Sequence, residues 1–237
     1  TDVIEEKAAE LISTWRAEHG SVVARMQRSV RDLIAPLWHL GASPMLPTTV
    51  EARDVYPAPT EKVKGDGPEP IAVYPHHLYV IPEGKKNAGQ FPVDTSRSSW
   101  ERKVLEAELR AETLVGWYRN PGSGRNALAV PYEFGDEYLL MHPDFLFWHD
   151  DGNGEYVMDI VDPHQHNQAD TGPKWSALAK YAQDHSDQVR RCMAVIELSG
   201  KLRALDLTAP GIEDRLWAAT NMALVEALFD EVGLAYM

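Results

Sequence analysis

Residues 139–161 read LLMHPDFLFWHDDGNGEYVMDIV, and this stretch decides the fold. It belongs to two apolar runs, Tyr138–Trp148 and Glu155–Val161, whose aromatic and β-branched content is typical of strands. The residues Asp151-Gly152-Asn153-Gly154 between the runs are typical of a tight turn. We therefore expect the two strands to pair as a hairpin.

An aspartate lies within each of these runs, Asp144 in the first and Asp159 in the second. An ionised carboxylate is costly to bury unless it is paired or bound to a metal. Two acids on paired strands could bring their oxygens together, as a hard cation such as Mg²⁺ requires. Pro143 cannot donate to a strand ladder, so it indicates a local distortion beside Asp144. The structural alternative is that each aspartate faces water or pairs with an arginine such as Arg119.

The pattern around this hairpin predicts an α/β (α+β) domain with a mixed sheet. Ser98 to Glu101 fits a capping box that opens a helix. Helices flank a core of order αβββαβ, followed by a further strand and helix. The expected helices are 98–114, 173–183 and 212–232, and the expected strands are 127–132, 138–148, 155–161, 190–198 and 202–207.

The chain divides into three parts by its sequence pattern. Residues 1–40 carry apolar positions at helical spacing and form a helical extension. Residues 41–96 are rich in proline, which indicates a linker with at most short strands. Residues 97–237 form the domain proper.

Composition limits the classes of function. The formal net charge of −13 over 237 residues opposes tight binding to DNA phosphates, unless basic residues gather on one face or another domain delivers the substrate. No apolar run reaches the length of a membrane span, so we expect no membrane partner. The single cysteine, Cys192, excludes an internal disulfide and suits a cytoplasmic location.

The acids also lie in a recognisable order of motifs. Pro143-Asp144, a turn and an acid in the next strand resemble the signature of the PD-(D/E)XK nuclease superfamily. The likeness covers about residues 97–207 and resembles the C-terminal nuclease domains of type III restriction and related helicase–nuclease defence proteins. It rests on Trp100-Glu101, 116–120, 130–132, 142–145, 159–164, Lys174 and 178–182.

This resemblance implies a restriction-endonuclease-like fold and hydrolysis of DNA phosphodiester bonds in restriction or anti-phage defence. It implies Mg²⁺, for which Mn²⁺ can substitute, held by Asp144 and Asp159 with Glu101 contributing from the helix. Glu101 also has a simpler interpretation, as the reciprocal half of the capping box. A helicase or ATPase region, in the same or another chain, is the partner that the resemblance implies.

The sequence departs from the family at one position. Val161 stands where the family usually has a lysine, two residues after the second acid. Lys174, or His164 as a general acid or base, is expected to replace that lysine. Arg119 and Asn120 are expected to contact phosphate or to close a turn. If no residue replaces the lysine, the domain is a catalytically inactive module that binds DNA or a protein partner.

A different metal chemistry is a second alternative. His164-Gln165-His166 lies beside several aspartates, and such a set can bind Zn²⁺. No second spaced histidine pair and no H-E-x-x-H helix accompany it, so we favour the nuclease interpretation.

Overall fold

The computed structural model describes most of the domain and little of the N-terminal part. The described residues are 72–78, 83–84, 88–89, 91–93, 99–122, 127–135, 137–164 and 168–236, with single positions between Lys7 and Val22. Those single positions are helical, as the helical extension predicts. The rest of the helical extension and most of the linker lie outside the described residues.

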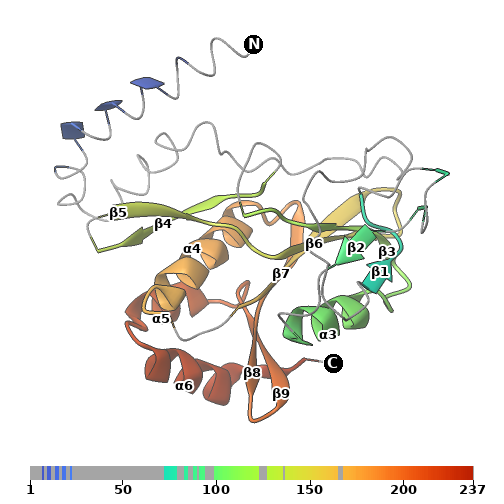
Figure 1. Cartoon of the computed structure of the whole chain (residues 1–237). Coiled ribbons are helices and arrows are strands. Elements are labelled where there is room, and N and C mark those ends of the chain that lie inside the picture. The colour runs from blue at the N-terminus through green and yellow to red at the C-terminus, as the bar shows by residue number, and fades with distance from the viewer. Residues whose placement is uncertain are drawn as a thin grey trace, which may run out of the picture.

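A six-stranded sheet forms the centre of the domain, in the order β10-β9-β8-β7-β6-β3 (Figure 1). All neighbouring strands are antiparallel except β7 and β8, which are parallel. The domain is therefore a mixed α/β structure with a mostly antiparallel sheet, as expected. The strands are β3 (Leu114–Arg119), β6 (Phe145–Asp150), β7 (Tyr156–Pro163), β8 (Val189–Leu198), β9 (Lys201–Asp206) and β10 (Leu234–Ala235).

Helices cover both faces of this sheet (Figure 1). On one face, Leu105 of α3 packs in a cluster with Phe145 of β6. On the other, Leu146 of β6 shares a cluster with Leu178 of α4 and Phe229 of α6. Because neighbouring residues of a strand point to opposite faces, β6 supplies side chains to both layers. The helices are α3 (Ser99–Glu108), α4 (Thr171–Asp184), α5 (Ile212–Ala218) and α6 (Met222–Val232).

Two hairpins lie outside the central sheet. β1 (Ala72–Tyr74) pairs with β2 (Phe91–Val93), and β4 (Val130–Phe134) pairs with β5 (Glu137–Met141). The second hairpin interrupts the chain between β3 and β6 and packs against α4. The strand expected at 138–148 is therefore two strands in different sheets, separated at Pro143, which has no N–H to continue a ladder.

Two helix predictions were too long, while one helix and two strands between them were predicted well. The helix expected to reach residue 114 ends at Glu108, and β3 follows where no strand was predicted. The helix expected at 212–232 is broken into α5 and α6, because Asn221 caps the second helix by accepting the Leu224 N–H at 3.1 Å. The expected elements at 173–183, 190–198 and 202–207 are confirmed within two residues. Within the described part of the chain, no helix has the length and hydropathy needed to cross a membrane.

Candidate metal centre

The pairing of β6 with β7 brings two aspartates together at one end of the sheet. Phe145 is opposite Val161, so Asp144, one residue before β6, lies opposite Asp162. The backbone N–H of Asp144 donates to Oδ1 of Asp162 at 3.1 Å. His164 follows two residues later, and one ligand atom from each of these three residues lies within 4.8 Å of the others. Two carboxylates and an imidazole are a ligand set that suits a divalent metal.

Asp162 is a buried carboxylate that forms no ion pair with the residues that the structure describes. It is 2 % exposed, and its Oδ2 accepts a hydrogen bond from Trp175 Nε1 at 2.8 Å. Among the described residues, no lysine, arginine or histidine forms an ion pair with it. Burying such a charge costs several kcal/mol unless a counter-ion compensates, so the environment of Asp162 favours a bound cation.

His164 offers a free nitrogen beside the two aspartates. Its backbone N–H donates to the Val195 carbonyl of β8 at 3.1 Å, which fixes the start of the loop after β7. Its Nε2 is buried and has no hydrogen-bond partner among the described residues. A buried ring nitrogen is normally satisfied, so this atom is available to a ligand.

Arg119 connects Asp144 to Glu101 of the helix α3. Its Nη1 lies 3.0 Å from Asp144 Oδ1, its Nη2 lies 2.9 Å from Glu101 Oε2, and its guanidinium stacks over the Phe145 ring at 4.7 Å. Glu101 therefore reaches the site through Arg119. Burial raises the pKa of Asp144 to about 8, with Arg119 lowering it and the charges of Asp162 and Glu101 raising it. A cation at this position would stabilise the carboxylate form.

Asn120 shapes the backbone next to Asp144 and does not face solvent. It is 5 % exposed, its Nδ2 donates to the carbonyls of Leu128 at 2.9 Å and Pro143 at 2.8 Å, and its Oδ1 accepts the Leu128 N–H at 2.8 Å. Its own N–H donates to the Asp144 carbonyl at 2.9 Å. Of the two expectations for Asn120, these contacts fit the structural one, in which it holds the turn beside Asp144.

Asp159 does not lie with Asp144, and the prediction that these two acids meet is wrong. Asp159 pairs in register with Phe147 and is fully buried. Arg190 binds both of its oxygens, at 2.9 and 2.7 Å, and Arg191 Nε adds a contact at 2.8 Å. Glu108 and His149 are close enough to complete a ligand set with Asp159. The two arginines already neutralise that cluster, so Asp159 has the arginine-paired role that was the structural alternative.

Lys174 is also occupied elsewhere. Its Nζ lies 3.1 Å from Asp170 Oδ2, donates to Gln168 Oε1 at 2.9 Å and lies 5.7 Å from the centre of the Tyr132 ring. Asp170 also accepts from the Tyr132 hydroxyl at 2.7 Å. These contacts join the start of α4 to the β4–β5 hairpin and do not include Asp144, Asp159 or Asp162. His166 of the proposed zinc pair lies outside the described residues.

The fold and this cluster define an α/β protein with a carboxylate–histidine centre at the end of its central sheet. The chain belongs to the YagJ family, whose family model matches residues 75–237. It is 32% identical to Protein YagJ of Escherichia coli (strain K12) over 235 residues. This match covers 99% of this chain and 91% of the relative. No solved structure matches the chain. Neither family nor relative carries an activity in its name.

Proposed function

We propose that this chain is a metal-dependent nuclease domain whose metal ligands are Asp144, Asp162 and His164. One observation carries the proposal. Asp162 is a buried carboxylate without an ion pair among the described residues, hydrogen-bonded to the backbone of Asp144 and close to an unpartnered nitrogen of His164. This donor set fits Mg²⁺ or Mn²⁺.

The order of elements supports a restriction-endonuclease-like core. A helix, α3, is followed by β3, β6 and β7, which pair as an antiparallel meander. The helix α4 then leads to β8, which is parallel to β7. This is the αβββαβ order that the resemblance implies, with the β4–β5 hairpin inserted after the first strand.

The register of β6 with β7 suggests a different second acid for the nuclease motif. With Asp162 as the second acid, the motif is Pro143-Asp144 followed by Asp162-Pro163-His164. His164 then stands two residues after the acid, where the family usually has lysine. Under this proposal Val161 is not the position of the family lysine. We therefore propose that His164, and not Lys174, occupies the position of that lysine, where it serves as a metal ligand.

The residues of the site divide the chemistry between them. A divalent cation bound here would activate water and offset charge on the phosphate. Arg119, already next to Asp144, supplies a guanidinium suited to a phosphate oxygen. Glu101 holds Arg119 in place through its 2.9 Å ion pair, and Asn120 fixes the backbone carbonyls of Pro143 and Asp144.

DNA is the substrate we propose, on the strength of the resemblance. The net charge of −13 is compatible with this if the site carboxylates bind cations. Partnership with a helicase or ATPase region, and a role in restriction or phage defence, are proposals of the same origin.

Cleavage of supercoiled plasmid and of single-stranded DNA tests the proposal, with Mg²⁺, Mn²⁺ or EDTA. We expect metal-dependent cutting by the wild type and none by Asp144→Asn or Asp162→Asn. Asp184→Asn is the matched control, because Asp184 is an exposed acid of α4 paired only with Lys180 among the described residues. Metal binding without cutting by a folded wild type would instead favour the inactive binding module.

A further inference from the structure

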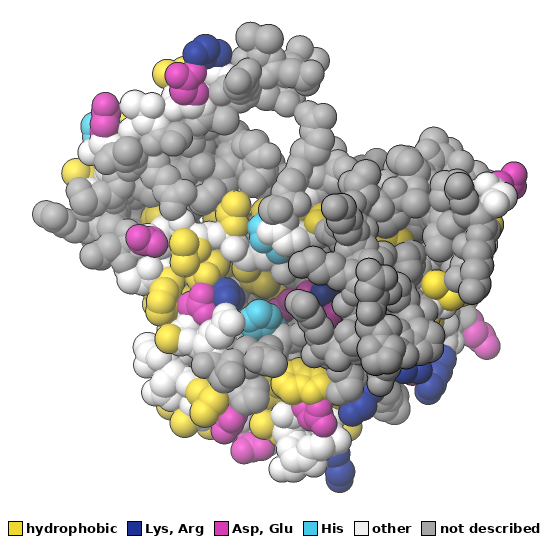
Figure 2. Space-filling view, viewed as in Figure 1, with side chains coloured by type: hydrophobic (Ala, Val, Ile, Leu, Met, Phe, Trp, Pro, Cys, Tyr) yellow, Lys and Arg dark blue, Asp and Glu magenta, His cyan; other side chains and the backbone are white. Residues whose placement is uncertain are grey.

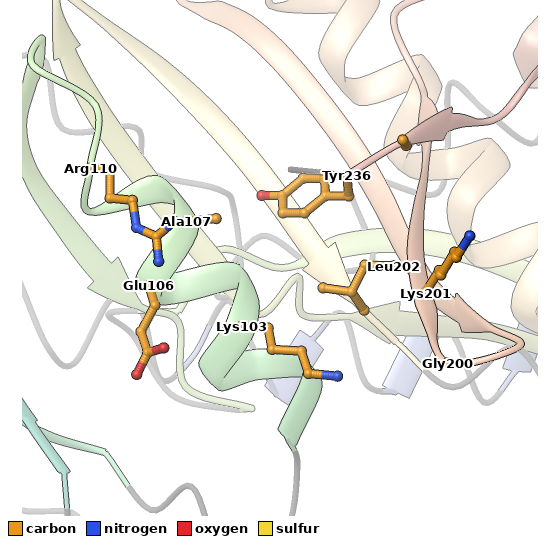
Figure 3. A pocket seen from close by; sticks show the side chains of 9 residues that line it. Lys103, Glu106, Ala107, Arg110, Gly200, Lys201, Leu202 and Tyr236 are labelled. Atoms are coloured by element: carbon orange, nitrogen blue, oxygen red, sulfur yellow. The ribbon is translucent and has the colours of Figure 1, made fainter.

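A second concave site lies on the α3 side of the sheet. It is a pocket of about 480 Å³ between α3 and the strands β9 and β10, a size suited to a small ligand (Figure 3). Its wall contains Lys103, Arg110, Lys201 and Tyr236, with one acid, Glu106. We propose that this pocket binds the phosphate group of a nucleotide.

The charge of the pocket is opposite to that of the chain. Three cations and one acid line it, although the chain has a formal net charge of −13. Glu106 is already neutralised, because Arg102 Nε binds its Oε1 at 2.7 Å. Figure 2 shows Lys and Arg side chains gathered at the lower right of the visible face, where Figure 1 places α3. A local excess of positive charge of this kind attracts anions.

The cations are free to bind a ligand. Arg110 and Lys201 form no ion pair among the described residues, and Lys103 has only a long one, 3.8 Å to Glu197. Lys103 lies on α3 and Arg110 lies two residues after its last residue, Glu108. Figure 3 shows Lys103 extending toward the turn at Gly200, Arg110 at the other end of the helix, and Lys201 directed away from α3. Lys103 and Arg110 therefore offer the pocket an ammonium and a guanidinium group, both of which bind phosphate.

Tyr236 gives the pocket a rigid aromatic wall. Its N–H donates to the Leu202 carbonyl at 3.1 Å, and its hydroxyl donates to Glu108. Glu108 is held in turn by Arg191 at 2.6 Å. Figure 3 shows the ring directed from the C-terminal strand toward Ala107 of α3. A fixed ring beside cations suits a base attached to a phosphate, since bases stack on aromatic side chains.

Calorimetric titration in EDTA, with no divalent cation, tests this site separately from the nuclease. The probes are AMP, adenosine, and a thymidine decamer with or without a 5′-phosphate. We expect AMP to bind and adenosine not to bind. We expect Lys103→Gln/Arg110→Gln to weaken phosphate binding by at least about tenfold, because each lost cation removes a charge-assisted hydrogen bond. Both side chains are exposed, so the fold should be retained.

Lys180→Gln/Arg215→Gln is the matched control, with the same change of charge on α4 and α5. Binding of the phosphorylated decamer but not of AMP would assign the site to the end of a strand, and binding of AMP would assign it to a free nucleotide. If no phosphate-bearing probe binds, or if the α3 double variant binds as tightly as the wild type, the proposal is wrong.

Discussion

The backbone amide of Asp144 donates a hydrogen bond to the carboxylate of Asp162, with 3.1 Å between N and Oδ1. The contact lies one residue beyond the last pair of the β6–β7 ladder, Phe145 with Val161. Asp159, three residues earlier on the same strand, instead binds Arg190 and Arg191. One strand thus carries two buried aspartates, and only one of them has a cationic partner among the described residues.

Asparagine at these two positions should give different results. Asp162→Asn removes the charge, so we expect metal affinity to fall by at least about tenfold. Because the amide can accept from only one of the Trp175 and Asp144 N–H groups, we also expect a small loss of stability, about 1 kcal/mol. Asp159→Asn leaves Arg190 without its partner and Arg191 with Glu108 alone, so we expect stability to fall by roughly 3 kcal/mol with metal affinity unchanged in the folded protein. Urea unfolding and Mn²⁺ titration measure the two effects. If Asp159→Asn lost metal binding while Asp162→Asn kept it, the proposal that Asp162 binds the metal would be wrong.

Counting along the hairpin could have identified Asp162 from the sequence. Asp144 and Asp162 lie nine residues before and after Asn153, in the middle of the turn, whereas Asp159 lies only six after it. The register of a hairpin is set by its turn, and a symmetric hairpin therefore places Asp144 opposite Asp162. The motif-based prediction chose Asp159 because an acid within the apolar run was the stronger signal. Both aspartates lie on β7, and the register places Asp162, not Asp159, opposite Asp144.

Other features depend on contacts far apart in the sequence. Nothing local to Arg190 and Arg191 indicates that both turn to Asp159, because that contact forms only once β8 pairs with β7 in parallel. Likewise, the run 138–148 has the composition of one long strand. Pro143 interrupts the ladder locally, and Asn120, which binds the Pro143 carbonyl, holds the break between the two sheets. Elements with local signals, such as α4 and β8, were predicted within two residues.

Gly172 tests the packing of α4 on α5. A Cβ at this position would lie 2.3 Å from the Ala219 carbonyl oxygen and 2.7 Å from that of Leu216. Gly→Ala within a helix normally stabilises by up to about 1 kcal/mol, but here the backbone of α5 would have to move. We expect Gly172→Ala to destabilise the domain by about 1–3 kcal/mol in urea unfolding. Gly122→Ala, where a Cβ meets nothing within 4 Å, is the control; equal effects from the two would contradict the packing.

His149 lies buried in the arginine-paired cluster. It is 1 % exposed, its Nδ1 lies 3.0 Å from Thr113 Oγ1, and its Nε2 lies 3.5 Å from Asp159 Oδ2. Burial lowers the pKa of His149 below its usual 6.5, with Asp159 opposing the shift and Arg190 adding to it. The folded protein therefore holds this ring neutral at a pH where the unfolded chain is already protonated.

This shift predicts a loss of stability in acid. Below pH 6.5 the unfolded chain binds a proton at His149 that the folded protein does not, so the free energy of unfolding falls as the pH falls from 6.5 toward the lowered pKa. Above pH 6.5 the contribution is fully present. We expect the stability advantage of the wild type over His149→Gln to shrink between pH 7.5 and 5.5, measured by urea unfolding. An advantage that is constant or grows in acid would mean that the ring is charged in the fold.

Two substitutions of His164 separate its possible roles in the site. If its free nitrogen binds the metal, His164→Asp keeps a ligand and shifts the preference from Mn²⁺ toward Mg²⁺, because carboxylates suit Mg²⁺ better than imidazole does. His164→Lys then loses metal affinity by at least about tenfold, since an ammonium group repels a cation. If His164 instead orients water or assists the leaving group as the family lysine does, His164→Lys keeps both affinity and cleavage, while His164→Asp binds metal but does not cut.

Mn²⁺ titration and plasmid cleavage, run on both variants, distinguish these two patterns. Full activity in both variants would exclude His164 from the site, and would leave Asp144 and Asp162 as the only ligands that the described residues supply there.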